Sequence, residues 1–309
     1  MEVKIKNSNE TEENRLRSEK VASPVSIVFK RLKKNKLAIA GMWILIILVL
    51  VAIFGPIISP YKMETIDLYN INAEPTVQHI LGTDSVGRDV LTRLMYAGRI
   101  SLSVGVIAVL VEVVIGSILG ALAGYYGGIV DGIIMRITDI FLCFPFLPLL
   151  IMMSALMSDL KVKPEYRMYV VMFIIGILSW PSLCRIIRGQ ILSLREQEFM
   201  QAAEALGLKD RRKMFKHLLP NTFASIIVSA TLGIGGAILT ESSLSFLGLG
   251  ITPPTPSWGT MVQVVNDMYV LENQPWLWAP PGICIFLTVM AINLFGDGLR
   301  DALDPKLKM

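Results

Sequence analysis

Three carboxylates lie within mostly apolar stretches of the sequence, at Glu112, Asp139 and Glu241. If those stretches cross a bilayer, an ionisable side chain near the centre costs roughly 2.5–3.5 kcal/mol to insert and is a functional candidate by default. We expect Glu112 and Glu241 either to face a path through the membrane or a partner subunit, or to be satisfied by polar groups inside the helix packing. Asp139 lies one helical turn from Arg136, so we predict a structural ion pair there.

The sequence lacks the residue patterns of the common catalytic and metal sites. Its two histidines, His79 and His217, belong to neither an HExxH motif nor a serine or cysteine triad. Its three cysteines, Cys143, Cys184 and Cys284, have no CxxC spacing. A phosphate-binding loop of the form GxxxxGK followed by Ser or Thr is also missing. We therefore expect no catalytic residue, no metal site and no cofactor on this chain, and a membrane-embedded enzyme is disfavoured.

The composition indicates that most of the chain lies in a membrane. Hydrophobic residues make up 53% of the 309 positions, and charged residues only 17%. A helix needs about 20 apolar residues to cross a hydrocarbon core. We predict an all-α integral membrane protein with six spans, at 37–59, 101–124, 137–157, 168–187, 223–247 and 279–295. Pro145 and Pro148 lie inside the third span, where we expect neighbouring helices to tolerate them.

Lysine and arginine residues are distributed unevenly among the segments between these spans. Of the 29 basic residues, 22 lie in the first 36 residues, at Arg136, within 185–216 or within 300–309. The other seven lie within 60–100 and 158–167. Because cytoplasmic loops carry an excess of Lys and Arg, we predict a multi-pass protein with both termini in the cytoplasm.

This arrangement divides the chain into parts with different surroundings. They are a cytoplasmic tail at 1–36, a first span at 37–59, an outer segment at 60–100, a five-helix core at 101–298 with a loop at 188–221, and a second tail at 299–309. Residues 1–22 show no hydrophobic period, so we expect a flexible tail and no cleavable signal peptide. The basic segment before the first span is expected to contact membrane lipid.

The outer segment 60–100 contains a short amphipathic pattern. The pattern predicts a helix capped by Asp84 or Ser85 and lying flat on the outer membrane surface. Its apolar face would consist of Val86, Val90, Leu91 and Leu94. A plain connecting loop is the alternative.

The loop 188–221, predicted inside, has an apolar stripe at helical spacing. Phe199, Ala202, Ala203 and Leu206 recur at i, i+3, i+4 and i+7, which places them on one face of a short helix. An apolar face in water requires a partner, so the helix is predicted to dock onto another protein. A basic amphipathic loop resting on anionic lipid is the alternative.

A bend and a second helix are expected to follow this stripe. Gly207 can end the first helix, because glycine readily takes the left-handed conformation found at helix C-termini. Asp210 can cap a second short helix, which carries Phe215 and must stop before Pro220.

The same loop resembles the EAA loop of ABC importer permeases. The match is carried by Gln201-Ala202-Ala203, Gly207 and His217-Leu218-Leu219-Pro220-Asn221. In that family the loop inserts into a groove of a cytoplasmic ATPase subunit and couples nucleotide-driven closure to the membrane helices. The coupling residues that the resemblance implies are Phe199, Gln201, Ala202, Ala203, Leu206, Gly207, Asp210, Phe215, Leu219 and Pro220. Gln201 stands where the motif has Glu, which removes one charge and any salt bridge made from that position.

Other stretches resemble the C-type permeases of dipeptide and oligopeptide importers, over most of the chain. They are Leu81-Gly82-Thr83-Asp84, Gly87-Arg88-Asp89-Val90-Leu91, Leu244-Ser245-Phe246-Leu247-Gly248-Leu249-Gly250, Pro253-Pro254 and Pro256-Ser257-Trp258-Gly259. The resemblance implies a prokaryotic cell-membrane location and a heterodimer with a homologous second permease. It also implies one or two P-loop ATPase subunits that hold ATP and magnesium, an extracellular substrate-binding protein, and no nucleic acid.

The cargo is not encoded in any motif of this chain. Relatives of the same branch carry nickel or nickel chelates, glutathione and other small solutes, and the scarcity of histidine argues against a bare metal ion. A gradient-driven secondary transporter is the alternative from another class. Such proteins usually show inverted repeats with interrupted helices, and we see no such repeat.

Overall fold

The computed structural model describes residues 24–303 as a bundle of helices without strands, apart from one isolated bridge between Thr83 and Asp89. Five helices within these residues are long and apolar enough to cross a membrane. They are α3 (Lys36–Ile58), α4 (Val90–Tyr126), α7 (Pro164–Leu194), α11 (Phe223–Phe246) and α14 (Pro275–Leu303). The predicted fold class, an all-helical membrane protein, holds for the described residues.

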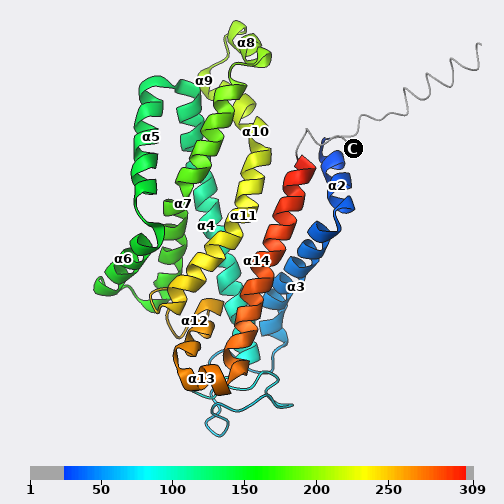
Figure 1. The fold of residues 1–309 in the computed structure, drawn as a ribbon, viewed down its shortest axis with the longest axis vertical. Helices are drawn as coiled ribbons and strands as arrows, with labels where there is room; N and C mark the ends of the chain where they lie inside the picture. Colours follow the sequence, from blue (N-terminus) through cyan, green and yellow to red (C-terminus); the bar gives the residue numbers. More distant parts are fainter. Residues whose placement is uncertain (1–23, 304–309) are drawn as a thin grey trace, which may run out of the picture.

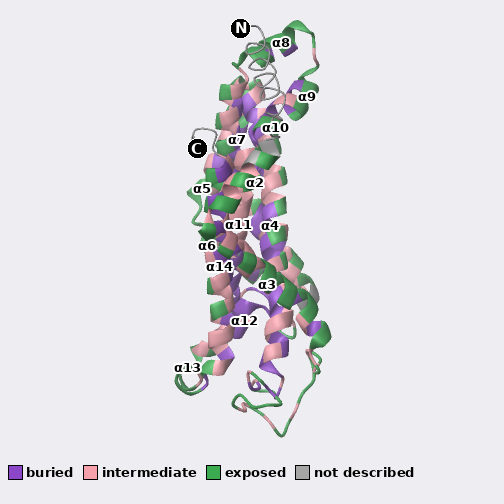
Figure 2. Cartoon of the chain, turned by 90° about the vertical axis from the view of Figure 1, so that its right-hand side faces the viewer, coloured by how far each residue is buried: buried purple, intermediate pink, exposed green. Residues whose placement is uncertain are grey.

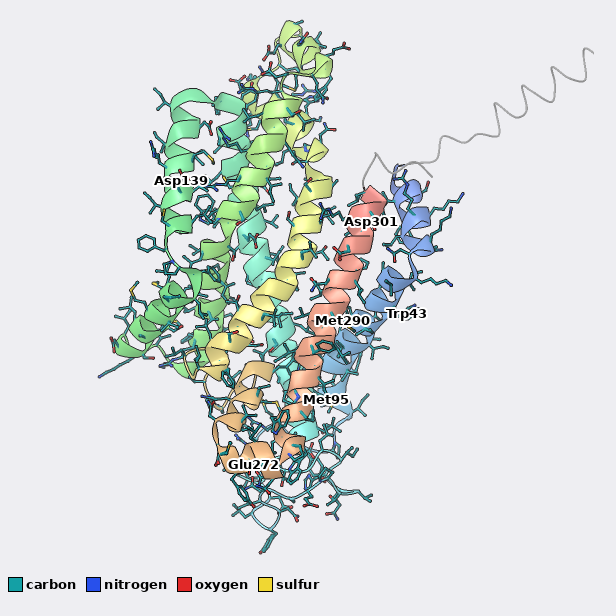
Figure 3. The ribbon with its side chains drawn as sticks, in the orientation of Figure 1. Trp43, Met95, Asp139, Glu272, Met290 and Asp301 are labelled. Atoms are coloured by element: carbon teal, nitrogen blue, oxygen red, sulfur yellow. The ribbon has the colours of Figure 1, made fainter. Side chains whose placement is uncertain are left out.

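The two ends of the bundle carry different short elements (Figure 1). One end, here called the α8 end, carries α2 (Pro24–Lys34), α8 (Glu198–Ala205), α9 (Asp210–Arg212) and the last turns of α14. The opposite end, here called the α13 end, carries the irregular segment 59–89 and α13 (Met268–Asn273). Asp301 on α14 and Glu272 on α13 lie at these opposite ends (Figure 3).

The third predicted span is broken in the structure. Residues 137–157 belong to two helices, α5 (Gly128–Cys143) and α6 (Phe146–Asp159), which meet at 83°. Pro145 causes the break, because proline has no amide hydrogen and disfavours the helical conformation in the residue before it. Phe144 accordingly has extended angles, φ −79° and ψ 133°. The prediction of one continuous helix was wrong here, and the number of spans is six only if this pair counts as one.

The predicted surface helix near Asp84 is absent from the described structure. The Oδ1 atom of Asp84 accepts hydrogen bonds from the amides of Val86 (3.0 Å) and Arg88 (2.9 Å), which makes a turn that Gly87 completes at φ +78°. The helix begins only at Val90, and it continues without interruption into α4. Asp89 is therefore the N-cap, and the connecting-loop alternative describes 84–89.

A small network of side chains shapes the irregular segment 59–89. The buried His79 lies with Nδ1 2.9 Å from Oδ1 of Asp89, and its ring stacks on Tyr61 at 4.8 Å. The other carboxylate oxygen of Asp89 accepts from the amide of Thr92 at 2.7 Å and so caps α4. The N-terminus of α4 is thereby tied to the loop that precedes it.

Before the first long helix, α2 forms a short basic helix that packs against α14. Asn35 separates it from α3 and caps α3 by accepting a hydrogen bond from the amide of Ala38 at 3.1 Å. This element occupies the predicted basic juxtamembrane segment. The predicted flexible tail and the last six residues lie outside the described residues.

Glycines let α4 and α7 approach closely. Gly116, Gly120 and Gly124 follow one another at intervals of four on α4 and face α7. A Cβ placed on Gly120 would lie 2.7 Å from the carbonyl oxygen of Cys184, which is closer than real Cβ atoms come. Small residues at such a seam allow backbones to pack tightly where lipid supplies no hydrophobic driving force.

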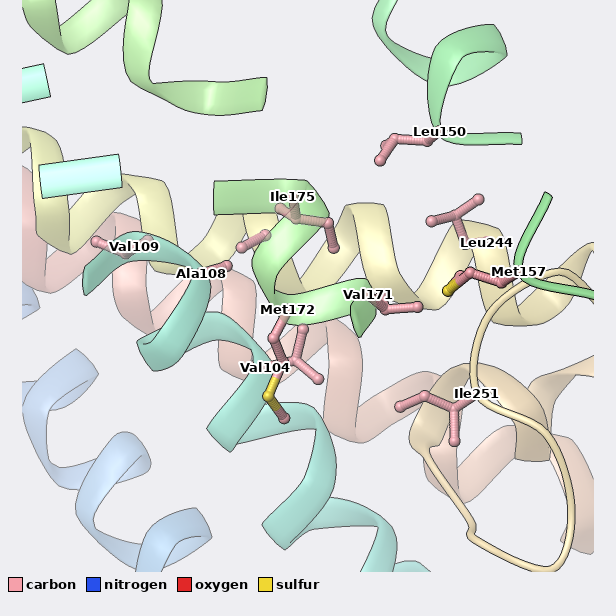
Figure 4. Close-up of a cluster of buried hydrophobic side chains, with 11 residues drawn as sticks. Val104, Ala108, Val109, Leu150, Met157, Val171, Met172, Ile175, Leu244 and Ile251 are labelled. Carbon is pink, nitrogen blue, oxygen red and sulfur yellow. The ribbon is translucent and has the colours of Figure 1, made fainter. Parts of the chain in front are cut away.

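An apolar core lies where four helices meet. Val104 of α4, Leu150 of α6, Met172 of α7 and Leu244 of α11 are each fully or almost fully buried in it (Figure 4). By contrast, many residues on the outside of the bundle are exposed in the single chain (Figure 2), and large apolar side chains are among them. Trp43 of α3, for example, is 57% exposed. Such faces are suited to lipid or to another membrane subunit.

Candidate coupling loop and membrane-embedded carboxylates

Helix α8 ends as the sequence predicts, at Gly207. This glycine has φ +64°, its amide donates to the carbonyl of Glu204 at 2.8 Å, and the amide of Leu208 donates to the carbonyl of Ala203 at 3.1 Å. These two bonds form a Schellman motif, which satisfies carbonyls left free at the end of the helix. The chain therefore turns sharply between α8 and α9.

The apolar residues of α8 divide between two faces. Phe199, Ala202 and Leu206 are exposed, Leu206 by 78%, and are here called the tip patch. Ala203 is 5% exposed and lies inward together with the buried Met200. The prediction that Ala203 shares the exposed stripe was wrong, because successive helical residues are about 100° apart and Met200 anchors the side on which Ala203 lies. Gln201 is exposed, like the tip patch.

The second helix of the loop begins and ends differently from the prediction. Lys209 occupies the N-cap position, and Asp210 is the first helical residue. The helix also passes Pro220, because α9 continues into the π-helical turn η1 (Lys213–Leu218) and then into α10 (Leu219–Asn221). The amide of Leu219 bonds to the carbonyl of Met214, five residues back, and this wider turn makes room for the proline ring.

Buried side chains that sequence reasoning missed attach the loop to the bundle. Met200, Met214 and Leu218 pack with Ile187 and Ile191 of α7 in one apolar cluster. Met214 and Leu218 are four residues apart, and this spacing is the signal that was present in the sequence. Of the predicted coupling residues in this second helix, Phe215 is 40% exposed, Pro220 is exposed and Leu219 is half-buried.

A polar cluster joins the loop to the last turn of α4. The hydroxyl of Tyr125 donates to Oδ1 of Asp210 at 2.6 Å, and Nζ of Lys213 lies 3.1 Å from the same oxygen. Hydrogen bonds from Tyr125 and Lys213 lower the pKa of Asp210, and those with Tyr125 and Asp210 raise the pKa of Lys213. Nearby, Nη1 of Arg195 donates to the carbonyl of Gly124 at 3.1 Å. Tyr125, Asp210 and Lys213 are here called the latch.

The carboxylate of Asp139 has a different partner from the one predicted. It lies 2.5 Å from Nη2 of Arg185 on α7, whereas Arg136 on its own helix is exposed. Further along the same two helices, Arg188 makes a two-pronged contact with Asp131, at 2.5 and 2.6 Å. Because α5 runs beside α7, its acidic residues meet basic residues of that helix. The predicted structural role of Asp139 fits, but the predicted pair was wrong.

Glu112 and Glu241, the two candidates for a path through the membrane, lie in unlike surroundings. Glu241 is fully buried and accepts hydrogen bonds from the hydroxyls of Ser245 (2.6 Å) and Ser101 (3.4 Å). The Ser101 hydroxyl in turn accepts from the amide of Trp258 at 3.1 Å. Glu241 therefore joins α4, α11 and α12 (Trp258–Val262) in the manner of the packing alternative.

Glu112 is half-buried on α4 and faces Gly233 of α11. A Cβ placed on Gly233 would lie 3.4 Å from Oε2 of Glu112. Within residues 24–303 this carboxylate has no hydrogen bond or ion pair. In the same residues, no group of three or more His, Cys, Asp or Glu side chains is placed to hold a metal ion.

Two family models match the sequence. Residues 116–309 match the binding-protein-dependent transport system inner membrane component, and residues 23–75 match the N-terminal TM domain of oligopeptide transport permease C. The matches together cover most of the chain and include the loop 188–221.

Three similar proteins extend over nearly the whole chain. The dipeptide transport system permease protein DppC of Alkalihalophilus pseudofirmus is 43% identical over 93% of this chain and 91% of its own length. The oligopeptide transport system permease protein OppC of Bacillus subtilis is 41% identical, with 90% and 88% covered. The glutathione transport system permease protein GsiD of Shigella flexneri is 41% identical, with 95% and 94% covered.

Proposed function

Because the chain belongs to the family of binding-protein-dependent transport system inner membrane components, which are permease subunits of ABC importers, we propose that it passes dipeptides and oligopeptides across the membrane. The observation that carries this proposal is the similarity, at 41–43% identity, to relatives named for dipeptide and oligopeptide transport. The chain is a multi-pass membrane protein, as the family and the five long apolar helices require.

The proposed orientation places the α8 end in the cytoplasm of a prokaryotic cell. Counting the bent pair α5–α6 as one broken span gives six spans and brings both termini to the same side. The excess of basic residues supports this orientation, since Lys33 and Lys34 of α2 and Arg211 and Arg212 of α9 all lie at the α8 end. The α13 end then faces outward.

The loop 188–221 is the proposed contact with separate ATPase subunits, which hold ATP and magnesium. Its tip patch and Gln201 are exposed, while Met200 and Ala203 on the other face are buried. An apolar patch that the fold leaves uncovered is suited to a protein groove. The latch and the buried anchors attach the loop to α4 and α7, so a displacement of the loop reaches those spans.

The proposed assembly contains a homologous second permease, which completes the path as a heterodimer, and an extracellular substrate-binding protein. Exposed apolar faces such as that of α3 are suited to lipid or to the second permease. Glu112, which is half-buried and has no partner within the described residues, is the better candidate to face the path or the second permease. Glu241 is assigned a packing role.

Glutathione is a second candidate substrate, because GsiD is as similar to this chain as OppC. Glutathione is itself a tripeptide, so a path of the same width serves both. Nickel chelates or another small solute would be the remaining candidates if none of these peptides were taken up.

The experiment is uptake by the complete complex, purified with its partner subunits, into proteoliposomes that enclose or exclude ATP. Labelled dipeptide, pentapeptide and glutathione are offered together with the binding protein. ATP-dependent uptake of the two peptides supports the proposal. Uptake of glutathione alone would replace the cargo, and uptake without ATP but with an ion gradient would overturn the class.

A further inference from the structure

A cavity at the α13 end is lined in part by a buried arginine whose hydrogen-bond donors are only partly satisfied. The cavity has a volume of about 470 Å³ and lies between segment 72–93 and segment 253–277. This volume is within the range of small-molecule sites. Its lining includes Asn72, Asp84, Arg88, Arg93, Gln263 and Gln274.

Arg93 is the central group of this cavity. Its residue is 8% exposed, and its Nη1 atom is buried without a hydrogen-bond partner among the described residues. A guanidinium stays charged at any physiological pH, and leaving one of its donors buried and unpaired is unfavourable. On the other side of the group, Nε lies 3.5 Å from Oδ2 of Asp84. The arginine is thus held in place while one of its donors has no partner among the described residues.

The carboxylates in the cavity lining already have hydrogen-bond partners. The lining carries two guanidinium groups, on Arg88 and Arg93, and two carboxylates, on Asp84 and Asp267. Asp84 is already engaged, since its Oδ2 accepts from Nε of Arg88 at 2.8 Å and its Oδ1 accepts from two backbone amides. Asp267 also lines the cavity, but its Oδ1 accepts from the amide of Tyr269 at 2.9 Å. Both carboxylates therefore have other partners, whereas Nη1 of Arg93 has none among the described residues and can pair with the carboxylate of a ligand.

A second unsatisfied atom lies in the same wall. Oδ1 of Asn72 is buried without a hydrogen-bond partner among the described residues. The amide of Asn72 donates to the carbonyl of Asp84 at 3.1 Å, which ties this acceptor to the residue that contacts Arg93. The cavity therefore offers a cationic donor and a neutral acceptor in one place.

We propose that this cavity binds the C-terminal end of a peptide, with the terminal carboxylate on Arg93 and the last peptide N–H on Asn72. A guanidinium matches a carboxylate in shape as well as charge. A carboxylate next to an amide N–H is present in every unmodified peptide that does not end in proline, whatever its side chains. This inference rests on the proposed peptide transport and names the end of the substrate that the permease recognises.

The cavity is better suited to a free peptide than to an acidic side chain of a docked protein. Both Arg93 and Gln274 are more than nine-tenths buried, so a ligand must enter the wall and not merely rest on a surface. The volume is larger than one carboxylate side chain needs, which leaves room for the final residue of a peptide.

The test is direct binding of a labelled tripeptide, as the free acid and as the C-terminal amide, to the permease–ATPase complex without binding protein. For the wild type we expect the amide to bind roughly tenfold or more weakly, because a hydrogen bond to a charged group is lost. Arg93→Gln should weaken binding of the free acid by a similar factor and leave binding of the amide nearly unchanged.

A second variant covers the case in which Arg93→Gln fails to assemble. Asn72→Asp places a negative charge in the same wall, and Asp tolerates the left-handed backbone of this position, φ +52°. It should repel the free acid and spare the amide. The control is Arg167→Gln, which removes one positive charge from a residue outside the cavity lining and should change neither affinity.

Equal binding of the free acid and the amide by the wild type, or free-acid binding that Asn72→Asp leaves intact, overturns the inference. A third result also overturns the inference: the wild type binds no peptide, and the binding protein docks more weakly to Asn72→Asp. The carboxylate that enters the cavity would then belong to the binding protein. If the wild-type complex takes up peptides normally, only this inference fails. If it takes up none, the proposed function fails.

Discussion

The two ends of this molecule are stabilised by different means. At the α8 end, short helices are attached by buried methionine and leucine side chains and by the latch, and an apolar patch stays exposed. At the α13 end, an irregular chain is fixed by side chains that bond to backbone, as Asp84 and Asp89 do. Helices attached by packing can move as a unit, whereas a loop fixed residue by residue keeps a defined shape. The first suits transmission of movement, and the second suits recognition.

The largest effect on folding should come from a substitution in the seam between α4, which extends to both ends, and α7. Gly120→Val forces a branched side chain against the carbonyl of Cys184, and overpacking of this kind costs about 3 kcal/mol or more. We expect little folded protein in the membrane, measured by fluorescence-detected gel filtration. Gly132→Val is the matched control, because a Cβ at Gly132 meets nothing within 4 Å. Equal yields of both variants would mean that the seam is not tight.

The next largest effect should be confined to the α13 end. Asp89→Ala removes the cap of α4 and leaves the buried Nδ1 of His79 without its 2.9 Å partner, at a cost of about 2 kcal/mol. We expect faster proteolysis within 59–89 while the α8 end stays resistant, as mapped by mass spectrometry of the fragments. Cleavage that rises equally at the α8 end would contradict the separation of the two ends.

A smaller effect on stability, but a large one on coupling, is expected at Gly207. Gly207→Val places a β-branched residue at φ +64°, which costs about 1–2 kcal/mol and should change the angle between α8 and α9. We expect ATP hydrolysis without uptake in proteoliposomes, with normal membrane insertion. Gly189→Val is the control, since it lies at the same end in a helix with open space around it. Normal uptake by Gly207→Val would sink the coupling role of the loop.

The smallest effect should come from the latch. Tyr125→Phe removes the 2.6 Å hydrogen bond to Asp210, an exposed contact, so the melting temperature should fall by at most a few degrees. Because this bond lowers the pKa of Asp210, the wild-type latch stabilises the fold above the ordinary carboxyl pKa and loses that stabilisation as the pH falls through the lowered value. The variant should therefore lose less stability than the wild type on acidification. An identical decline in both would show that the latch does not contribute.

The predicted helix bounds are accurate for some helices and inaccurate for others. The predicted span 37–59 agrees closely with α3, and 223–247 with α11, because each is a uniform apolar run. Helices α4, α7 and α14 extend beyond their apolar runs, since capping and packing, not hydropathy, decide where they begin and end. The break at Pro145 was visible in the sequence but was outweighed by the apolar run around it.

The candidate site was predictable only where contacts are local. Periodicity located α8 and the turn at Gly207, because both depend on residues within one or two turns. Periodicity could not show that Ala203 faces inward, because its orientation follows from the packing of Met200 against α7. The contact between Tyr125 and Asp210 joins residues 85 positions apart, and no pattern in a single sequence pairs them.

The uninterrupted length of α4 has a mechanical consequence. Its 37 residues reach from the latch, at Tyr125, to the N-terminus beside the Arg93 cavity, a distance of about 55 Å at 1.5 Å per residue. The seam at Gly120 lies about five residues from the latch and about 30 from Val90, so a pivot there gives the rod unequal arms in a ratio of about six. A shift of about 1 Å at Tyr125 would swing Val90 by about 6 Å, and spin labels at both ends would measure that ratio. With such a pivot, a small displacement of α4 at the α8 end would become a larger displacement of its N-terminus at the α13 end.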